Sequence, residues 1–180
     1  MATPTTLPAV FVSGNVLTAQ QQNDLRGAFR VLQVVSTSKT DTFSSATANA
    51  WTDITGMTVS ITPSATTSKI FITAAVMAQS AQTGVASRYI RLVRDSTAVG
   101  IGDTAGSRIS ATTTQNVNND FPGSHVINFL DSPATVSATT YKLQFWQDGT
   151  TFYLNRSSSD PNGTNGGRFA SSITVMEISA

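Results

Sequence analysis

The sequence predicts an all-β protein, and three of its features support this prediction. Of its 180 residues, 28 are Thr and 22 are Ser, whereas only 3 are Lys and 1 is Glu, so helix-favouring residues are scarce. From residue 32 onward, apolar side chains recur at every second position in short runs, which is the period of a half-buried strand. Turn-forming residues separate these runs, and no helical period lies between them. The pattern predicts an antiparallel sandwich of the jelly-roll type.

Nine segments carry the strand period: residues 32–37, 51–54, 58–62, 70–79, 88–94, 125–130, 141–147, 152–155 and 172–178. Two of them alternate most clearly. In residues 70–79, one face is formed by Ile70, Ile72, Ala74, Val76 and Ala78. In residues 141–147, one face carries Tyr141, Leu143 and Phe145, and the other carries Lys142, Gln144 and Trp146. We expect each of these strands to be buried on one face only.

Short turn signals join the segments, at Thr55-Gly56, Pro63-Ser64, Asp131-Ser132-Pro133 and Asp148-Gly149. The last pair lies between two aromatic segments, and an Asp-Gly pair in that setting predicts a β-hairpin. Two longer stretches, 100–123 and 157–167, are polar and rich in glycine, so we expect them to be surface loops.

Residues 1–31 form a separate region in this prediction, ahead of a knob domain over residues 32–180. Residues 1–17 predict an extended arm that cannot bury itself and therefore gains order along a partner. Its candidate anchoring residues are Leu7, Pro8, Val10, Phe11, Val16 and Leu17. A short helix follows, with Thr18 and Gln21 as a capping box. Its apolar packing face, spaced at i, i+3, i+4 and i+7, consists of Leu25, Ala28, Phe29 and Leu32.

Composition and charge exclude several classes of function. The net charge of +1 is too small to drive nucleic-acid binding. No apolar run reaches the ~18–20 residues of a membrane span, and there is no Cys for disulfides or thiolate chemistry. Residues 1–10 lack the basic and apolar regions of a signal peptide, so we expect no secretion signal.

Residues that commonly carry catalysis are sparse. His125, the single imidazole, shares a strand face with Ile127 and Phe129, so we expect a packed histidine rather than a triad or metal site. Acids beside turn residues are expected to form Asx turns: Asp131, Asp148 and Asp160. Glu177 is the only glutamate, so the paired carboxylates of a glycosidase are not expected. We predict no enzymatic activity, no catalytic residues and no metal site.

Several segments resemble the C1q/TNF-type jelly-roll domain. They are Lys69-Ile-Phe-Ile-Thr-Ala-Ala-Val, Arg88-Tyr-Ile-Arg-Leu-Val-Arg-Asp-Ser, Tyr141-Lys-Leu-Gln-Phe-Trp and Ala170-Ser-Ser-Ile-Thr-Val-Met-Glu-Ile. The resemblance covers about two-thirds of the chain, with Thr67-Ser68 where that family has an aromatic residue. It implies a homotrimer.

Other phrases resemble small virion proteins of bacteriophages, particularly marine and cyanobacterial phages. They include Leu32-Gln-Val-Val-Ser-Thr-Ser-Lys, Trp51-Thr-Asp-Ile-Thr-Gly-Met-Thr-Val, Leu130-Asp-Ser-Pro-Ala-Thr and Gly14-Asn-Val-Leu-Thr-Ala. This resemblance implies a structural protein on the virion surface that binds other virion proteins. It leaves two functions open: a short tail fibre or fibre tip that attaches to the host, and a decoration protein that stabilises the capsid.

The loop over residues 157–167 is the candidate ligand loop, because its hydroxyl and amide groups suit a cell-surface glycan. Its candidate residues are Asp160, Asn162, Thr164 and Asn165. Asp160-Pro-Asn-Gly also resembles the start of a calcium loop, although Ser171 stands where an EF-hand has its bidentate Glu. Ca²⁺ is therefore the one cofactor considered.

Three aromatic residues near the end of the chain are candidates for a surface role: Trp146, Phe152 and Tyr153. The alternation puts Trp146 opposite the apolar face of its strand, and Phe152 and Tyr153 on opposite faces of theirs. Three alternatives remain open, namely packing under a loop, a subunit interface and a receptor-binding patch.

Overall fold

The structure is a computed structural model that describes residues 30–80, 88–114 and 122–179, together with the single positions 14, 16, 18, 19 and 22. The described residues form eleven strands and confirm the all-β prediction. The strands are β1 (Val31–Lys39), β2 (Phe43–Ser45), β3 (Thr52–Ile61), β4 (Lys69–Ser80), β5 (Arg88–Arg94), β6 (Thr97–Val99), β7 (Thr113–Thr114), β8 (Gly123–Asp131), β9 (Thr139–Gln147), β10 (Phe152–Leu154) and β11 (Ser171–Ile178). No helix of the described part of the chain is long and apolar enough to span a membrane.

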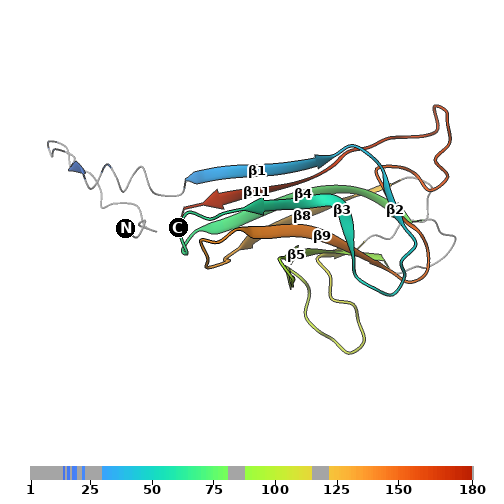
Figure 1. Ribbon diagram of the computed structural model, residues 1–180, viewed down its shortest axis with the longest axis horizontal. Helices are drawn as coiled ribbons and strands as arrows, with labels where there is room; N and C mark the ends of the chain where they lie inside the picture. The colour runs from blue at the N-terminus through green and yellow to red at the C-terminus, as the bar shows by residue number, and fades with distance from the viewer. Residues whose placement is uncertain are drawn as a thin grey trace.

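The strands form two antiparallel sheets. Sheet A has the order β1-β11-β4-β10-β2, and β8 pairs with the other edge of β4. Sheet B has the order β3-β9-β5-β6, and β7 also pairs with β5. The chain alternates between the sheets as it passes from β3 to β4, β5, β8, β9 and β11 (Figure 1). This alternation is the topology of a jelly-roll sandwich.

The core lies between the two sheets and is formed by one face of each. The predicted face of β4 is buried along its whole length, from Ile70 to Ala78. The predicted face of β9 is also correct, because Tyr141, Leu143 and Phe145 have no exposed surface. The period of two therefore identified the core correctly in both strands.

Two predicted turns are wrong. Segments 51–54 and 58–62 belong to one strand, β3, whose register with β9 shifts between Asp53 and Thr58. Gly56 lies in this irregular stretch with φ +84, so the glycine accommodates a bulge rather than a chain reversal. The Asp148-Gly149 pair does not close a hairpin, because β9 lies in sheet B and β10 in sheet A. The two strands instead face each other across the core, where the Phe145 and Phe152 rings stack 4.4 Å apart.

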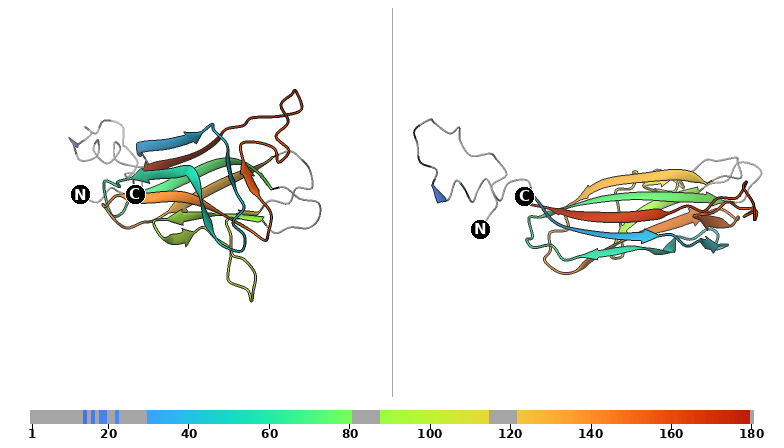
Figure 2. Two further views of the ribbon diagram at one scale, coloured as in Figure 1. Left: turned by 45° about the vertical axis from the view of Figure 1, so that its right-hand side comes forward. Right: turned by 90° about the horizontal axis from the view of Figure 1, so that it is seen from above.

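Both ends of the described knob meet at one end of the sandwich. The Arg30 N–H donates to Ser179 Oγ at 2.8 Å, and the Ser179 N–H donates to the Arg30 carbonyl at 2.9 Å. The loop between β10 and β11 lies toward the opposite end (Figure 2). The segment that precedes Arg30 therefore joins the knob at the end away from this loop.

The N-terminal predictions fall mostly on residues outside the described part of the chain: Leu7, Pro8, Val10, Phe11, Leu17, Leu25, Ala28 and Phe29. Val16 is described and is 90 % exposed. The Gln22 N–H donates to the Thr18 carbonyl at 3.1 Å, which is the bond of a single helical turn. The prediction for Leu32 is wrong, because this residue lies in β1 and not on a helix.

Candidate functional site

The outer face of sheet A carries an apolar row that was not predicted from the sequence. The row follows the strand register, in which Val34 lies opposite Met176, Met176 opposite Phe71, and Phe71 opposite Leu130. It therefore crosses four of the six strands of the sheet, from β1 through β11 and β4 to β8. Val34 is 56 % exposed and Leu130 is 55 % exposed, so the two ends of the row face solvent.

Beyond the apolar row this face is more polar, although Val126 of β8 is 60 % exposed there. Beside the apolar row, toward the termini, Leu32 is also exposed. On the other side the next row is hydrophilic, and Ser36 and Thr174 share a hydrogen bond of 2.8 Å there. The apolar row thus lies at the end of the sandwich where β1 begins and β11 ends (Figure 1).

The outer face of sheet A, taken as a whole, is somewhat smaller than one side of a standard protein interface. The outer strands β1 and β8 are both 9 residues long. Four strands of this length, ~4.8 Å apart and rising ~3.3 Å per residue, give a flat area of roughly 600 Å². A standard interface buries about 800 Å² on each partner, and an exposed apolar patch of several hundred Å² marks an interaction site.

The structure separates the three candidate aromatic residues. The prediction for Phe152 as a surface residue is wrong, because its ring is buried in the core against Phe145. Trp146 is half-buried on the outer face of sheet B, with its ring centre 5.6 Å from that of Tyr89. Tyr153 is half-buried at the end of sheet A, and the Arg156 guanidinium lies 4.4 Å from its ring centre.

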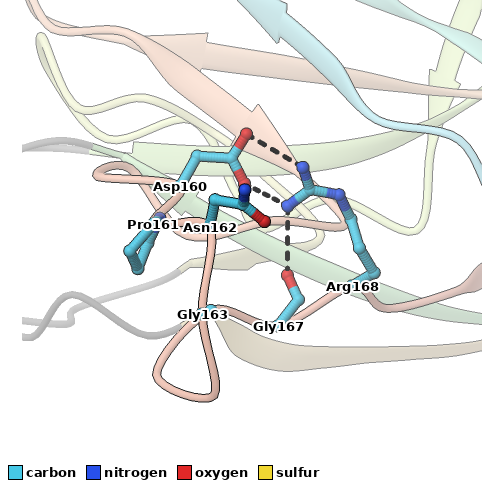
Figure 3. A pocket seen from close by; sticks show the side chains of 7 residues that line it. Asp160, Pro161, Asn162, Gly163, Gly167 and Arg168 are labelled. Carbon is cyan, nitrogen blue, oxygen red and sulfur yellow. Dashed lines mark hydrogen bonds and ion pairs between the residues drawn. The ribbon is translucent and has the colours of Figure 1, made fainter.

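The candidate ligand loop contains a cluster of charges around Asp160. The Arg168 guanidinium donates to both carboxylate oxygens of Asp160 (Figure 3). Arg156 lies 3.1 Å from the second oxygen. Hydrogen bonds from Arg168 lower the pKa of Asp160, and both arginine charges add to this effect. Asn162 lines the same hollow of about 470 Å³, whereas Thr164 and Asn165 are exposed and do not line it.

These contacts do not fit a calcium site in this loop. A calcium ion needs several oxygen ligands with negative charge. In this loop, two guanidinium groups already occupy the one carboxylate, so the described charges sum to a positive value. A group of three or more metal-ligating acids or histidines is not found within the described residues.

Three other titratable residues serve the fold. His125 is buried beside the core, and desolvation lowers its pKa to about 4, which agrees with a packed neutral imidazole. Asp131 was expected to form a turn; instead its buried carboxylate ends β8 and accepts hydrogen bonds from Arg94 and Tyr141. The Glu177 carboxylate is buried and accepts bonds from Gln33 and Ser64.

The sequence contained a signal for the apolar row. Phe71 alternates with the core residues of β4, and Met176 with those of β11, so both point outward. A large apolar residue at an outward position of a strand indicates either a second buried face or an interface. Only the register of four strands distant in sequence brings these residues into one row. No known protein-family model matches the chain, and no curated protein is similar enough to count as a relative.

Proposed function

We propose that this protein is a non-enzymatic structural protein of a phage virion, and that its knob assembles into a homotrimer through the outer face of sheet A. The apolar row from Val34 to Leu130 carries the assembly part of this proposal. Burying a fully exposed Val or Leu side chain contributes about 1.5–3 kcal/mol. Val34 and Leu130 are 56 % and 55 % exposed, so burying the rest of each contributes part of that. A second and third copy of the same chain are the occupants, because the resemblance to C1q/TNF domains implies threefold assembly.

The virion part of the proposal is supported by the resemblance to phage structural proteins and by the different features at the two ends of the knob. Residues 1–29 precede Arg30, which lies at the end of the sandwich beside Ser179. The loop with Asp160 and Arg168 lies toward the other end. We propose that the N-terminal arm attaches the knob to the particle while the opposite end faces outward, as in a short tail fibre or fibre tip that contacts the host.

The assembly is tested with aspartate substitutions on the proposed interface. Val34→Asp and Leu130→Asp each introduce a charge that trimer formation would desolvate, so both variants should sediment as folded monomers. Val136→Asp is the matched control, because Val136 is 53 % exposed in the loop after β8 and lies outside the row. If the three variants retain the same oligomeric mass as the original chain, the outer face of sheet A is not the interface.

The attachment role is tested on particles. Deletion of residues 1–29 should leave a soluble, folded knob that is absent from purified virions. Normal incorporation of the deleted chain would contradict the anchoring role. The number of copies per virion separates the fibre from the alternative, a capsid decoration protein, because a fibre requires a few trimers per tail and a decoration protein requires hundreds of copies.

A further inference from the structure

The outer face of sheet B carries a second organised surface, built from aromatic side chains. Trp146 of β9 lies opposite Tyr89 of β5, and their rings are tilted by 45° with centres 5.6 Å apart. Trp51 immediately precedes β3, whose first residue, Thr52, lies opposite Phe145. By this register Trp51 is level with Trp146, so three aromatic side chains cross the sheet in one row.

The neighbouring row is polar and is held rigidly. Gln144 donates to Asp53 at 2.6 Å and accepts from Arg91 Nε at 2.8 Å. The Arg91 guanidinium also lies 4.2 Å from the centre of the Trp51 ring. These bonds hold the polar side chains beside the aromatic row in place. Ordering these side chains when a ligand binds would therefore cost little free energy.

A hollow of about 580 Å³ opens beside the Trp146 and Tyr89 rings and is completed by the loop over residues 107–109. Arg108 is the one charged residue that lines it among the described residues, and Ser107 adds a hydroxyl. The Arg108 guanidinium donates to the Ala105 carbonyl at 3.3 Å and forms no salt bridge within the described part of the chain. An adjacent hollow of about 340 Å³ shares Tyr89 and Arg108 and contains Asp103.

We propose that this hollow binds an acidic saccharide of the host surface. The apolar C–H face of a sugar ring packs on Trp146 and Tyr89, and the sugar carboxylate accepts charge-assisted hydrogen bonds from Arg108. The charge complementarity is local, since the lining holds one cation and, among the described residues, no carboxylate. The proposal rests on the display of the knob on the particle and gives the host-facing function a defined ligand class.

A nucleic acid fits this surface less well. Stacking on aromatic rings suits bases as well as sugars, but a strand also needs several cations along its phosphates. Among the residues that the structure describes, Arg108 is the only cation lining the hollow, and the net charge of the chain is +1. Hydroxyl groups dominate the surrounding strand and loop instead, including Ser110, Thr112 and Thr113 of the adjacent hollow.

The test uses the full chain and measures calorimetric binding of an oligogalacturonate and of the matched neutral oligogalactose. We expect binding of the acidic probe, and at least tenfold weaker binding of it by Trp146→Ala. Arg108→Gln should bind both probes equally, because it removes only the charge that selects the acid. Arg108 is exposed, so this variant keeps the fold and separates ligand binding from stability. Tyr153→Ala is the control aromatic substitution and should bind as the original chain does.

The proposal is overturned if the original chain does not bind the oligogalacturonate, or if it binds both probes with equal affinity. It is also overturned if Trp146→Ala and Arg108→Gln both leave the affinity for the oligogalacturonate unchanged. Tighter binding of a single-stranded oligonucleotide than of the oligogalacturonate would overturn it as well. Sedimentation of the same samples keeps the two proposals distinct, because loss of sugar binding with an intact trimer refutes the ligand alone. A monomer that still binds the sugar refutes the assembly alone.

Discussion

The Tyr141 hydroxyl donates a hydrogen bond of 2.7 Å to the Asp131 carboxylate, and this bond joins the two sheets. Asp131 ends β8 of sheet A, whereas Tyr141 lies in β9 of sheet B. Arg94 of β5 donates to both oxygens of the same carboxylate, at 2.8 and 2.9 Å. Burial raises the pKa of Tyr141 above its ordinary value, and the bond to Asp131 raises it further, so the hydroxyl stays protonated as a donor.

Tyr141→Phe should reduce the free energy of unfolding by about 1–2 kcal/mol, because it removes one buried bond to a charged group while Arg94 still pairs with Asp131. Urea denaturation at pH 7 measures the change. Tyr153→Phe serves as control, since Tyr153 is only half-buried, and should change the free energy by less than ~0.5 kcal/mol. Equal effects of the two substitutions would show that the bond between the sheets is not a specific stabilising contact.

Asn155→Gly should destabilise the knob by about 2–4 kcal/mol. The Asn155 side chain is fully buried and donates to the carbonyls of Lys39 and Asp41 at 2.8 and 3.0 Å. It also accepts from Ser171 Oγ at 2.6 Å, so it ties the ends of β1 and β10 to the start of β11. Glycine tolerates the φ of +61 at this position, so the substitution removes the side-chain bonds without straining the backbone.

Asn49→Gly is the matched control for this experiment. Asn49 has a φ of +55, but its side chain is exposed and its backbone N–H makes the bond to the Gln147 carbonyl. The substitution keeps that bond, so thermal and urea midpoints should hardly change. If Asn155→Gly is as stable as Asn49→Gly, the buried bonds contribute nothing net to the fold.

The stability of the knob should fall between about pH 6.5 and pH 4 because of His125. Desolvation lowers the pKa of His125 from 6.5 to about 4, so in this interval the unfolded chain takes up a proton that the folded chain does not. The contribution is complete above pH 6.5 and decreases by roughly 2–3 kcal/mol as the pH falls to about 4. His125→Leu removes the group, and its unfolding free energy should stay nearly flat between pH 6.5 and pH 5, above the range in which the carboxyl groups titrate. The same pH slope in the variant would mean that His125 is not the titrating group.

A second loss of stability, at more acidic pH, should come from Glu177. Burial raises the pKa of this carboxyl, whereas hydrogen bonds from Ser64, Ser68 and Gln33 lower it by more. The pKa of Glu177 therefore lies below its ordinary value of 4.5. Its stabilising contribution is therefore present above pH 4.5 and is lost as the pH falls through the lowered pKa. Glu177→Gln should reduce the free energy of unfolding by about 1–3 kcal/mol at pH 7. The amide would place its own N–H donors against the donors of Gln33 and Ser64.

The same variant should lose less stability than the original chain between pH 4.5 and pH 2.5, as measured by urea midpoints. Asp103→Asn is the control, because Asp103 is exposed and forms no salt bridge within the described residues, so its removal should leave the acid profile nearly unchanged. A steeper acid loss in Glu177→Gln than in the original chain would contradict the assigned role of Glu177.

Sequence alone predicted the long strands because their alternation reflects a single buried face. It missed β2, β6 and β7, which have only two or three residues and so display no period. The Asp148-Gly149 pair predicted a local hairpin, but β10 pairs with β4 and β2 in sheet A, and its Phe152 meets Phe145 of β9 only across the core. Local turn chemistry does not indicate to which sheet the next strand belongs.

The candidate surfaces depended even more on long-range register. Trp146 was recognised as an outward residue from its own strand, but Tyr89, 57 positions earlier, becomes its neighbour only when β5 pairs with β9. In the same way Val34 and Leu130 belong to one row only through the two strands between them. Each side chain's outward orientation was predictable, whereas the rows they form were not.

Sedimentation equilibrium of the purified full chain at micromolar concentration tests the central claim most directly. If the outer face of sheet A is the interface of a homotrimer, the measured mass is three times the 18.9 kDa of a single chain. A mass of 18.9 kDa would contradict the account, because the row from Val34 to Leu130 would then remain exposed to water.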